Sequence, residues 1–79
     1  MTDVGSTSGA DPAVQGKVGR VLIRIRGAAG PGEVLVSVRG GTEAFIAYAD
    51  EVIDRDREVL VIGYRGHRAV DVVPWDLAV

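Results

Sequence analysis

Residues 16–40 have the sequence GKVGRVLIRIRGAAGPGEVLVSVRG, in which two alternating apolar segments are separated by a glycine-rich loop. Alternation with a period of two is typical of strands that bury one face. The loop, GAAGPG, contains three glycines and a proline, which cannot donate to a strand ladder, so a turn is expected there. The sequence therefore predicts a β-hairpin whose first strand runs from Val18 to Arg26.

The side-chain pattern also predicts how the two strands of this hairpin pair. With Arg26 opposite Glu33, every inward pair is β-branched, which favours sheet packing. A slip by one residue would turn the arginines inward, so the register is strongly specified. The predicted inward pairs are Val21 with Val38, Ile23 with Val36, and Ile25 with Val34. The predicted outward residues of the first strand are Arg20, Leu22, Arg24 and Arg26.

Three more strands are predicted after the hairpin, within residues 42–50, 57–65 and 67–74. Gly40 and Gly41 are expected to supply the positive φ angles of a tight turn. In the third strand we expect Ile46 and Tyr48 to face inward, which requires a β-bulge at the double glycine. Residues 50–58 are expected to form an acidic, irregular loop with at most one helical turn. A short turn at Arg65 and Gly66 is expected to place Val70 and Val72 opposite Val61 and Val59.

Five strands with short turns and no parallel crossover predict an all-β fold. The expected architecture is a small five-stranded OB-like Greek-key barrel over residues 16–79, with an SH3-like barrel as the nearest alternative. Residues 1–15 mix Gly, Ser, Thr, Asp and Pro without an apolar period, so they are expected to be a disordered tail.

The composition narrows the class of protein. The sequence contains no cysteine, which excludes disulfides and thiolate zinc sites. Its longest uncharged apolar run is far below the roughly 20 residues of a membrane span, and no signal-peptide pattern opens it. A cytoplasmic location is expected, with attachment to a membrane surface through a partner or a missing anchor left open. Whether the chain is a complete protein or an excised domain is also left open.

No catalytic, cofactor-binding or metal-binding residue is predicted. His67 is the single histidine and is expected to be an exposed turn residue, because no serine or cysteine stands in a motif that would use it as a base. The acids of residues 50–58 lack the glycine and terminal glutamate of an EF-hand loop, so they predict a solvated loop. We therefore expect a non-enzymatic protein.

Two binding functions remain open from the residues alone. Net charge of −2 argues against a general nucleic-acid footprint. An OB-like barrel could still bind single strands through a basic face, here formed by Arg20, Arg24, Arg26 and Arg39. A homo-oligomeric structural barrel fits the same pattern.

The order of short motifs along the chain resembles the soluble C-terminal domain of the NfeD family. The matching motifs are GKVG at 16–19, PGEV at 31–34, the double glycine at 40–41, VIGYRG at 61–66 and VDVVP at 70–74. Asp56 stands where the family tends to place glycine. The membrane helices and the serine-protease domain of longer members have no counterpart in this sequence, so no protease activity is implied.

The resemblance implies an OB-like interaction or adaptor module, associated with stomatin-, flotillin- or prohibitin-type membrane scaffold proteins. It implies a protein partner and no bound cofactor, and nucleic acid is not the expected partner. The residues themselves offer a place for contact if the first and fourth strands are neighbours. The candidate partner surface consists of Leu22, Arg24, Arg26, Leu35, Leu60, Ile62 and Tyr64.

Overall fold

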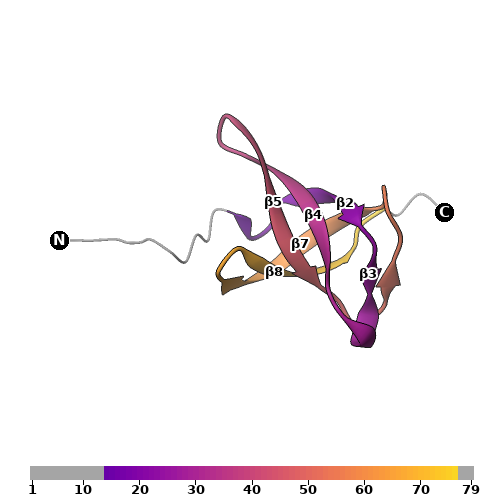
Figure 1. The fold of residues 1–79 in the computed structure, drawn as a ribbon. Helices are drawn as coiled ribbons and strands as arrows, with labels where there is room; N and C mark the ends of the chain where they lie inside the picture. Colours follow the sequence, from indigo (N-terminus) through magenta and orange to yellow (C-terminus); the bar gives the residue numbers. More distant parts are fainter. Residues whose placement is uncertain (1–13, 77–79) are drawn as a thin grey trace.

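The computed structural model describes residues 14–76, and strands dominate this part of the chain (Figure 1). A short 3₁₀ turn, η2 (Gly27–Ala29), lies between the strands of the first hairpin. The strands are β2 (Val18–Ile23), β3 (Ile25–Arg26), β4 (Gly32–Val38), β5 (Gly41–Tyr48), β6 (Val52–Ile53), β7 (Glu58–Gly66) and β8 (Ala69–Pro74).

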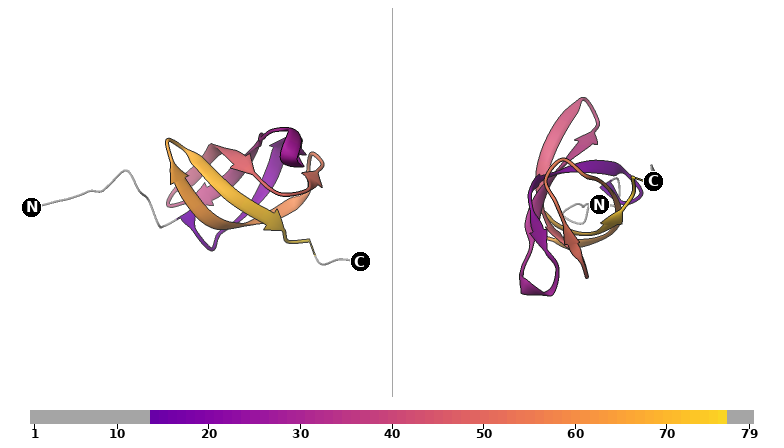
Figure 2. Two further views of the ribbon diagram at one scale, coloured as in Figure 1. Left: turned by 90° about the horizontal axis from the view of Figure 1, so that it is seen from below. Right: turned by 90° about the vertical axis from the view of Figure 1, so that its right-hand side faces the viewer.

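Five of these strands close into a barrel in the order β2-β4-β5-β8-β7. Neighbouring strands are antiparallel except for β5 and β8, which pair in parallel, and β2 closes the ring against β7. The end-on view in Figure 2 shows this ring, with the β4–β5 hairpin projecting beyond it. The predicted five-stranded OB-like barrel is thus confirmed, including the neighbouring first and fourth strands.

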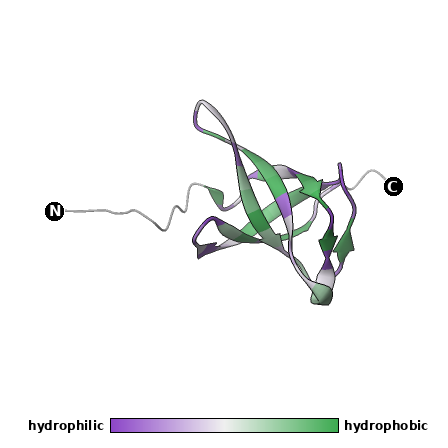
Figure 3. Cartoon of the chain, viewed as in Figure 1, coloured by the Kyte–Doolittle hydropathy of each residue, from purple (hydrophilic) through white to green (hydrophobic). Residues whose placement is uncertain are grey.

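The barrel interior is filled by aliphatic side chains and one phenylalanine. Figure 3 shows that apolar segments lie along the barrel strands, while the turns are more polar. The chain enters the core at Val14, which is 1% exposed and lies two residues before the domain boundary expected from the sequence. The residues of the predicted tail before Val14 lie outside the described part. The buried core consists of Val14, Val21, Ile25, Val34, Val36, Phe45, Ala47, Ile53, Val59, Val61, Val70 and Val72.

The predicted register of the first hairpin is wrong. Val21 lies opposite Val34 rather than Val38, and Ile23 lies opposite Glu33. Ile23 was expected in the core, but 56% of its surface is exposed.

A β-bulge and a change of partner explain this error. The register shifts between Val21 and Ile23, so the extra residue turns Ile23 outward. Ile25 then returns to the core in β3. This strand pairs with β6 instead of with β4, and Ile25 lies opposite Ile53. Gly32 makes this route possible, because it lies so close to the carbonyl groups before β3 that a side chain would not fit.

The predicted facing of the third strand is also wrong. Val38 pairs directly with Gly41, so the hairpin has a regular two-residue turn without the expected bulge. Of the two glycines, Gly40 takes the positive φ angle, 77°, which is a conformation that favours glycine.

The regular turn carries the alternation of β4 across to β5. Phe45 lies opposite Val34 and is buried, as is Ala47. Ile46 and Tyr48, which were expected inside, are exposed and half-buried respectively. The aromatic ring therefore fills the core, and the isoleucine faces the outside.

The last hairpin extends further than predicted. Strand β7 continues to Gly66, and the turn is made by His67 and Arg68, which both have positive φ. The expectation that His67 is an exposed turn residue is confirmed. The pairs are consequently displaced from the predicted ones, with Val72 opposite Val61, Val70 opposite Tyr64, and Pro74 opposite Val59.

The acidic segment between β5 and β7 contains short strand β6 and no helical turn. Ile53 is fully buried and anchors the segment to the core. Asp56 adopts a positive φ of 74°, which is a conformation that favours glycine.

Candidate partner-binding surface

The outer side of β2, β7 and β8 carries a row of aliphatic side chains. Val18 pairs with Leu60, and Leu60 pairs with Val73, so these three residues lie side by side across three strands. Ile62 follows on β7 and is 49% exposed. We call these four residues the apolar wall. Cross-strand neighbours on one face lie about 5 Å apart, so the four side chains form a continuous strip.

An ion pair fixes one end of the apolar wall. The Arg57 guanidinium donates two hydrogen bonds to the Asp76 carboxylate, with Nε–Oδ2 and Nη2–Oδ1 distances of 2.5 and 2.9 Å. This contact lowers the pKa of Asp76 and raises that of Arg57. The backbone N–H of Trp75 donates to the carbonyl oxygen of Glu58, which extends the pairing of β8 with β7 by one residue.

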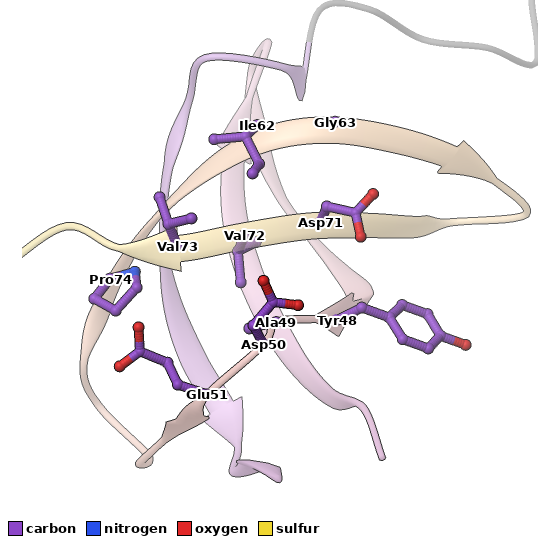
Figure 4. Close-up of a pocket in the computed structure, with 10 residues that line it drawn as sticks. All are labelled: Tyr48, Ala49, Asp50, Glu51, Ile62, Gly63, Asp71, Val72, Val73 and Pro74. Atoms are coloured by element: carbon purple, nitrogen blue, oxygen red, sulfur yellow. The ribbon is translucent and has the colours of Figure 1, made fainter. Parts of the chain in front are cut away.

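A groove of about 270 Å³ lies beside the wall, between β8 and the chain that follows β5 (Figure 4). Ile62 and Val73 belong to both the wall and the groove. The lining residues are Tyr48, Ala49, Asp50, Glu51, Ile62, Gly63, Asp71, Val72, Val73 and Pro74.

One carboxylate of the groove is already neutralised. Asp71 accepts a hydrogen bond from Arg65 Nε at 2.9 Å, and this contact raises the pKa of Arg65. The Arg65 guanidinium also stacks over the ring of Tyr48, 3.9 Å from its centroid. Together the three side chains hold the place where β5 and β8 pair.

The structure does not bring the residues of the predicted partner surface together in one place. Leu60 and Ile62 lie on the apolar wall. Leu35 lies opposite Arg20, on the next part of the barrel exterior. Tyr64 is half-buried and packs against the core instead of lying on the wall.

The remaining predicted residues lie near the bulge and the first loop. Leu22 is 42% exposed on β2. Arg24 pairs with Asp54 at 3.2 Å, and Arg26 lies on β3, opposite Val52. Residues 19–21 of β2 lie between these three residues and Val18, which is the residue of β2 that belongs to the wall.

The arginines of the nucleic-acid alternative do not form one free basic face. Arg20 lies 3.9 Å from Glu58 and donates to the Asp56 carbonyl oxygen. Arg24 is paired with Asp54 as described above, and Arg39 lies in the turn of the β4–β5 hairpin. Two of the four charges are therefore partly balanced by neighbouring acids.

Sequence reasoning did not identify Val18, Val73 or Trp75 as surface candidates. Their shared exposure depends on the three-strand register, which the strand pattern alone does not give. If the sequence had shown that β2 and β8 both pair with β7, these residues could have been predicted to lie next to Leu60 on the outside of the barrel.

Neither metal ligands nor a membrane span are found between residues 14 and 76. No group of three His, Asp or Glu side chains there could hold a metal ion. No helix in that range has the length and hydropathy to cross a bilayer.

Known proteins with a similar sequence or structure were compared with this chain. Among solved structures, the chain is similar to the solution structure of the soluble domain of the NfeD protein YuaF from Bacillus subtilis. The TM-score is 0.66 at 26% sequence identity, over 77% of this chain and 73% of that one. A search of curated proteins found no match.

A family model extends this similarity to most of the barrel. The model of the NfeD C-terminal domain matches residues 18–73, from the first residue of β2 to the penultimate residue of β8. The resemblance seen in the motifs of the sequence is thus confirmed, and the chain belongs to the NfeD C-terminal domain family.

Proposed function

We propose that this chain is a non-catalytic interaction module that binds a protein partner through the apolar wall. The carrying observation is the row formed by Val18, Leu60 and Val73, with Ile62 beside it, on the outside of a barrel whose interior is filled. Contiguous exposed aliphatic residues bordered by charged ones are typical of protein contact sites. The core side chains of residues 14–76 pack inside the barrel, which supports a site on its exterior.

The expected partner is a stomatin-, flotillin- or prohibitin-like membrane scaffold protein. This proposal is supported by family membership, because NfeD proteins are associated with such scaffolds. Such a partner would hold the barrel at the surface of a membrane. The module would then act as an adaptor in a membrane-associated complex.

The test is a binding titration with a purified stomatin-like protein encoded in the same genome. We expect saturable binding that is weakened at least tenfold by the double substitution Ile62→Ser and Val73→Ser, because removing two aliphatic side chains removes more than about 1.4 kcal/mol of apolar contact. Retention of native amide NMR dispersion would show that the variant still folds.

The matched control is Ile23→Ser. Ile23 also lies at a β-bulge and is also exposed, but it is outside the wall, so its replacement should leave binding unchanged. Equal loss in both variants, or absence of binding to the scaffold protein, would overturn the proposal. Sedimentation at several concentrations would test whether the chain self-associates. If self-association were lost in the wall variant, the partner at the wall would be a second copy of this chain instead of a scaffold protein.

A further inference from the structure

The groove beside the apolar wall exists because β5 stops pairing with β8 too early to cover it. The parallel pairing ends where Tyr48 meets Asp71, whereas β8 continues to Pro74. From Val72 onward, β8 is therefore paired with β7 on one side, and the other side faces the groove. An uncovered strand edge of this kind can accept an extended segment of another chain.

This edge presents hydrogen-bond acceptors. The Trp75 N–H donates toward β7, and backbone groups alternate in direction along an antiparallel strand. Val73, two residues earlier, therefore also directs its backbone groups to β7, and the carbonyl groups of Val72 and Pro74 face the groove. Pro74 has no N–H group to offer, so the end of the edge is suited to a partner that brings donors.

The charges around the groove favour the same kind of partner. Figure 4 shows the Asp50 carboxylate near Val72, and the Glu51 side chain directed toward Pro74. Both acids are exposed, and neither forms an ion pair with a basic side chain within residues 14–76. Asp71, in contrast, is balanced by its contact with Arg65.

We propose that this groove receives a lysine or arginine side chain of an extended partner segment, while a neighbouring apolar residue of that segment packs on Ile62 and Val73. The cation would lie between Asp50 and Glu51 and donate to the carbonyl groups at the end of β8. This inference rests on the proposed function, because Ile62 and Val73 belong to both the wall and the groove. It adds that the bound segment of the partner alternates basic and apolar residues.

The experiment is an NMR titration of the full chain with a defined probe. The probe is a capped ten-residue peptide in which lysine alternates with valine and serines flank both ends. We expect saturable shifts confined to the amide signals of residues 49–51, Val72, Val73 and Trp75. One control peptide replaces lysine by glutamate, and another replaces valine by serine; both should bind at least fivefold more weakly.

Variants assign the charge effect to the groove. The pair Asp50→Asn and Glu51→Gln should weaken binding of the lysine peptide about five- to tenfold, since it removes two exposed ion pairs. The matched pair Glu33→Gln and Glu43→Gln removes the same charge elsewhere and should change affinity less than twofold. Equal weakening by both pairs, or shifts spread over the surface, or no saturable shift, would overturn the inference.

The same variants separate this inference from the proposed function. If the scaffold protein binds the wall and the Asp50 and Glu51 substitutions leave that binding unchanged, the groove inference fails and the adaptor function stands. If the lysine peptide binds in the groove but the scaffold protein does not bind the chain, the proposed partner fails instead.

Discussion

The α-carbon of Gly32 lies directly against the main chain of Ile23, whose carbonyl oxygen occupies the space that a Cβ at position 32 would need. This contact lets the strand before the first loop cross close to the start of β4. We expect Gly32→Ala to lower the free energy of unfolding by about 2–3 kcal/mol, because the backbone must move to accommodate the methyl group. Urea denaturation monitored by circular dichroism would measure the loss.

Gly41→Ala provides the control for that substitution. No atom lies within 4 Å of a Cβ placed at Gly41, and its φ is not positive, so stability should change by no more than about 0.5 kcal/mol. A similar loss at both positions would show that general glycine effects, and not the close approach, determine the result.

Val14 should contribute to stability although it precedes the first strand. It is almost fully buried and belongs to the barrel core. Val14→Ala should lower the free energy of unfolding by about 1–2 kcal/mol through lost burial and a residual cavity. Val52→Ala, at a half-exposed valine, should cost less than about 0.5 kcal/mol, and the two can be compared in one thermal denaturation series.

The ion pair between Arg57 and Asp76 predicts a particular pH dependence. The folded protein lowers the pKa of Asp76 below its ordinary value of 3.8, so the pair contributes stability that is complete above that pH. This contribution is lost as the pH falls through the lowered pKa. The difference in Tm between the natural chain and Asp76→Asn should therefore be largest near pH 7 and decrease in acid.

A second substitution verifies the cause of that pH dependence. In an Arg57→Gln background, Asp76→Asn should produce a much smaller pH-dependent difference in Tm, because the largest cause of the lowered pKa of Asp76 has been removed. Persistence of the difference would indicate that another group stabilises the Asp76 carboxylate.

The left-handed backbone at Asp56 predicts a stabilising substitution. Asp56→Gly relieves the positive φ and should raise the free energy of unfolding by about 0.5 kcal/mol, whereas Asp56→Val should lower it by about 1–2 kcal/mol. Chemical denaturation of both variants would test the order. A valine variant as stable as the glycine variant would contradict the conformational explanation.

Local patterns in the sequence were sufficient to identify the strands and the barrel. Val59, Val61, Val70 and Val72 were expected to face one another across the last hairpin, and all four are buried, although their pairs are displaced. The glycine and proline loop after Arg26 marked the first turn. These features depend on residues near each other in the chain, and for this reason the sequence expresses them directly.

Register and facing depended on interactions between distant segments. Ile23 has the same chemistry as Ile25, and only the bulge and the pairing of Ile25 with Ile53 decide which one is buried. On β5, Phe45 and Ile46 are both suitable core residues, and the regular turn at Gly40 selects the phenylalanine.

The candidate surface was only partly foreseen for the same reason. Leu60 and Ile62 could be recognised because β7 is apolar on both faces. Val18 and Val73 could be added only when the neighbours of β7 were known. The groove was not predicted, because it arises from the different lengths of β5 and β8 rather than from a motif.

The parallel pairing of β5 with β8 has a consequence for how the chain folds during synthesis. Strand β8 is the last strand of the described chain to leave the ribosome, and it alone joins β5 to β7. Until residue 71 has emerged, β5 remains an open edge and the ring cannot close. Contacts between residues distant in the sequence form slowly. Until β8 pairs with both β5 and β7, these two strand edges are therefore exposed and could pair with the strands of other chains.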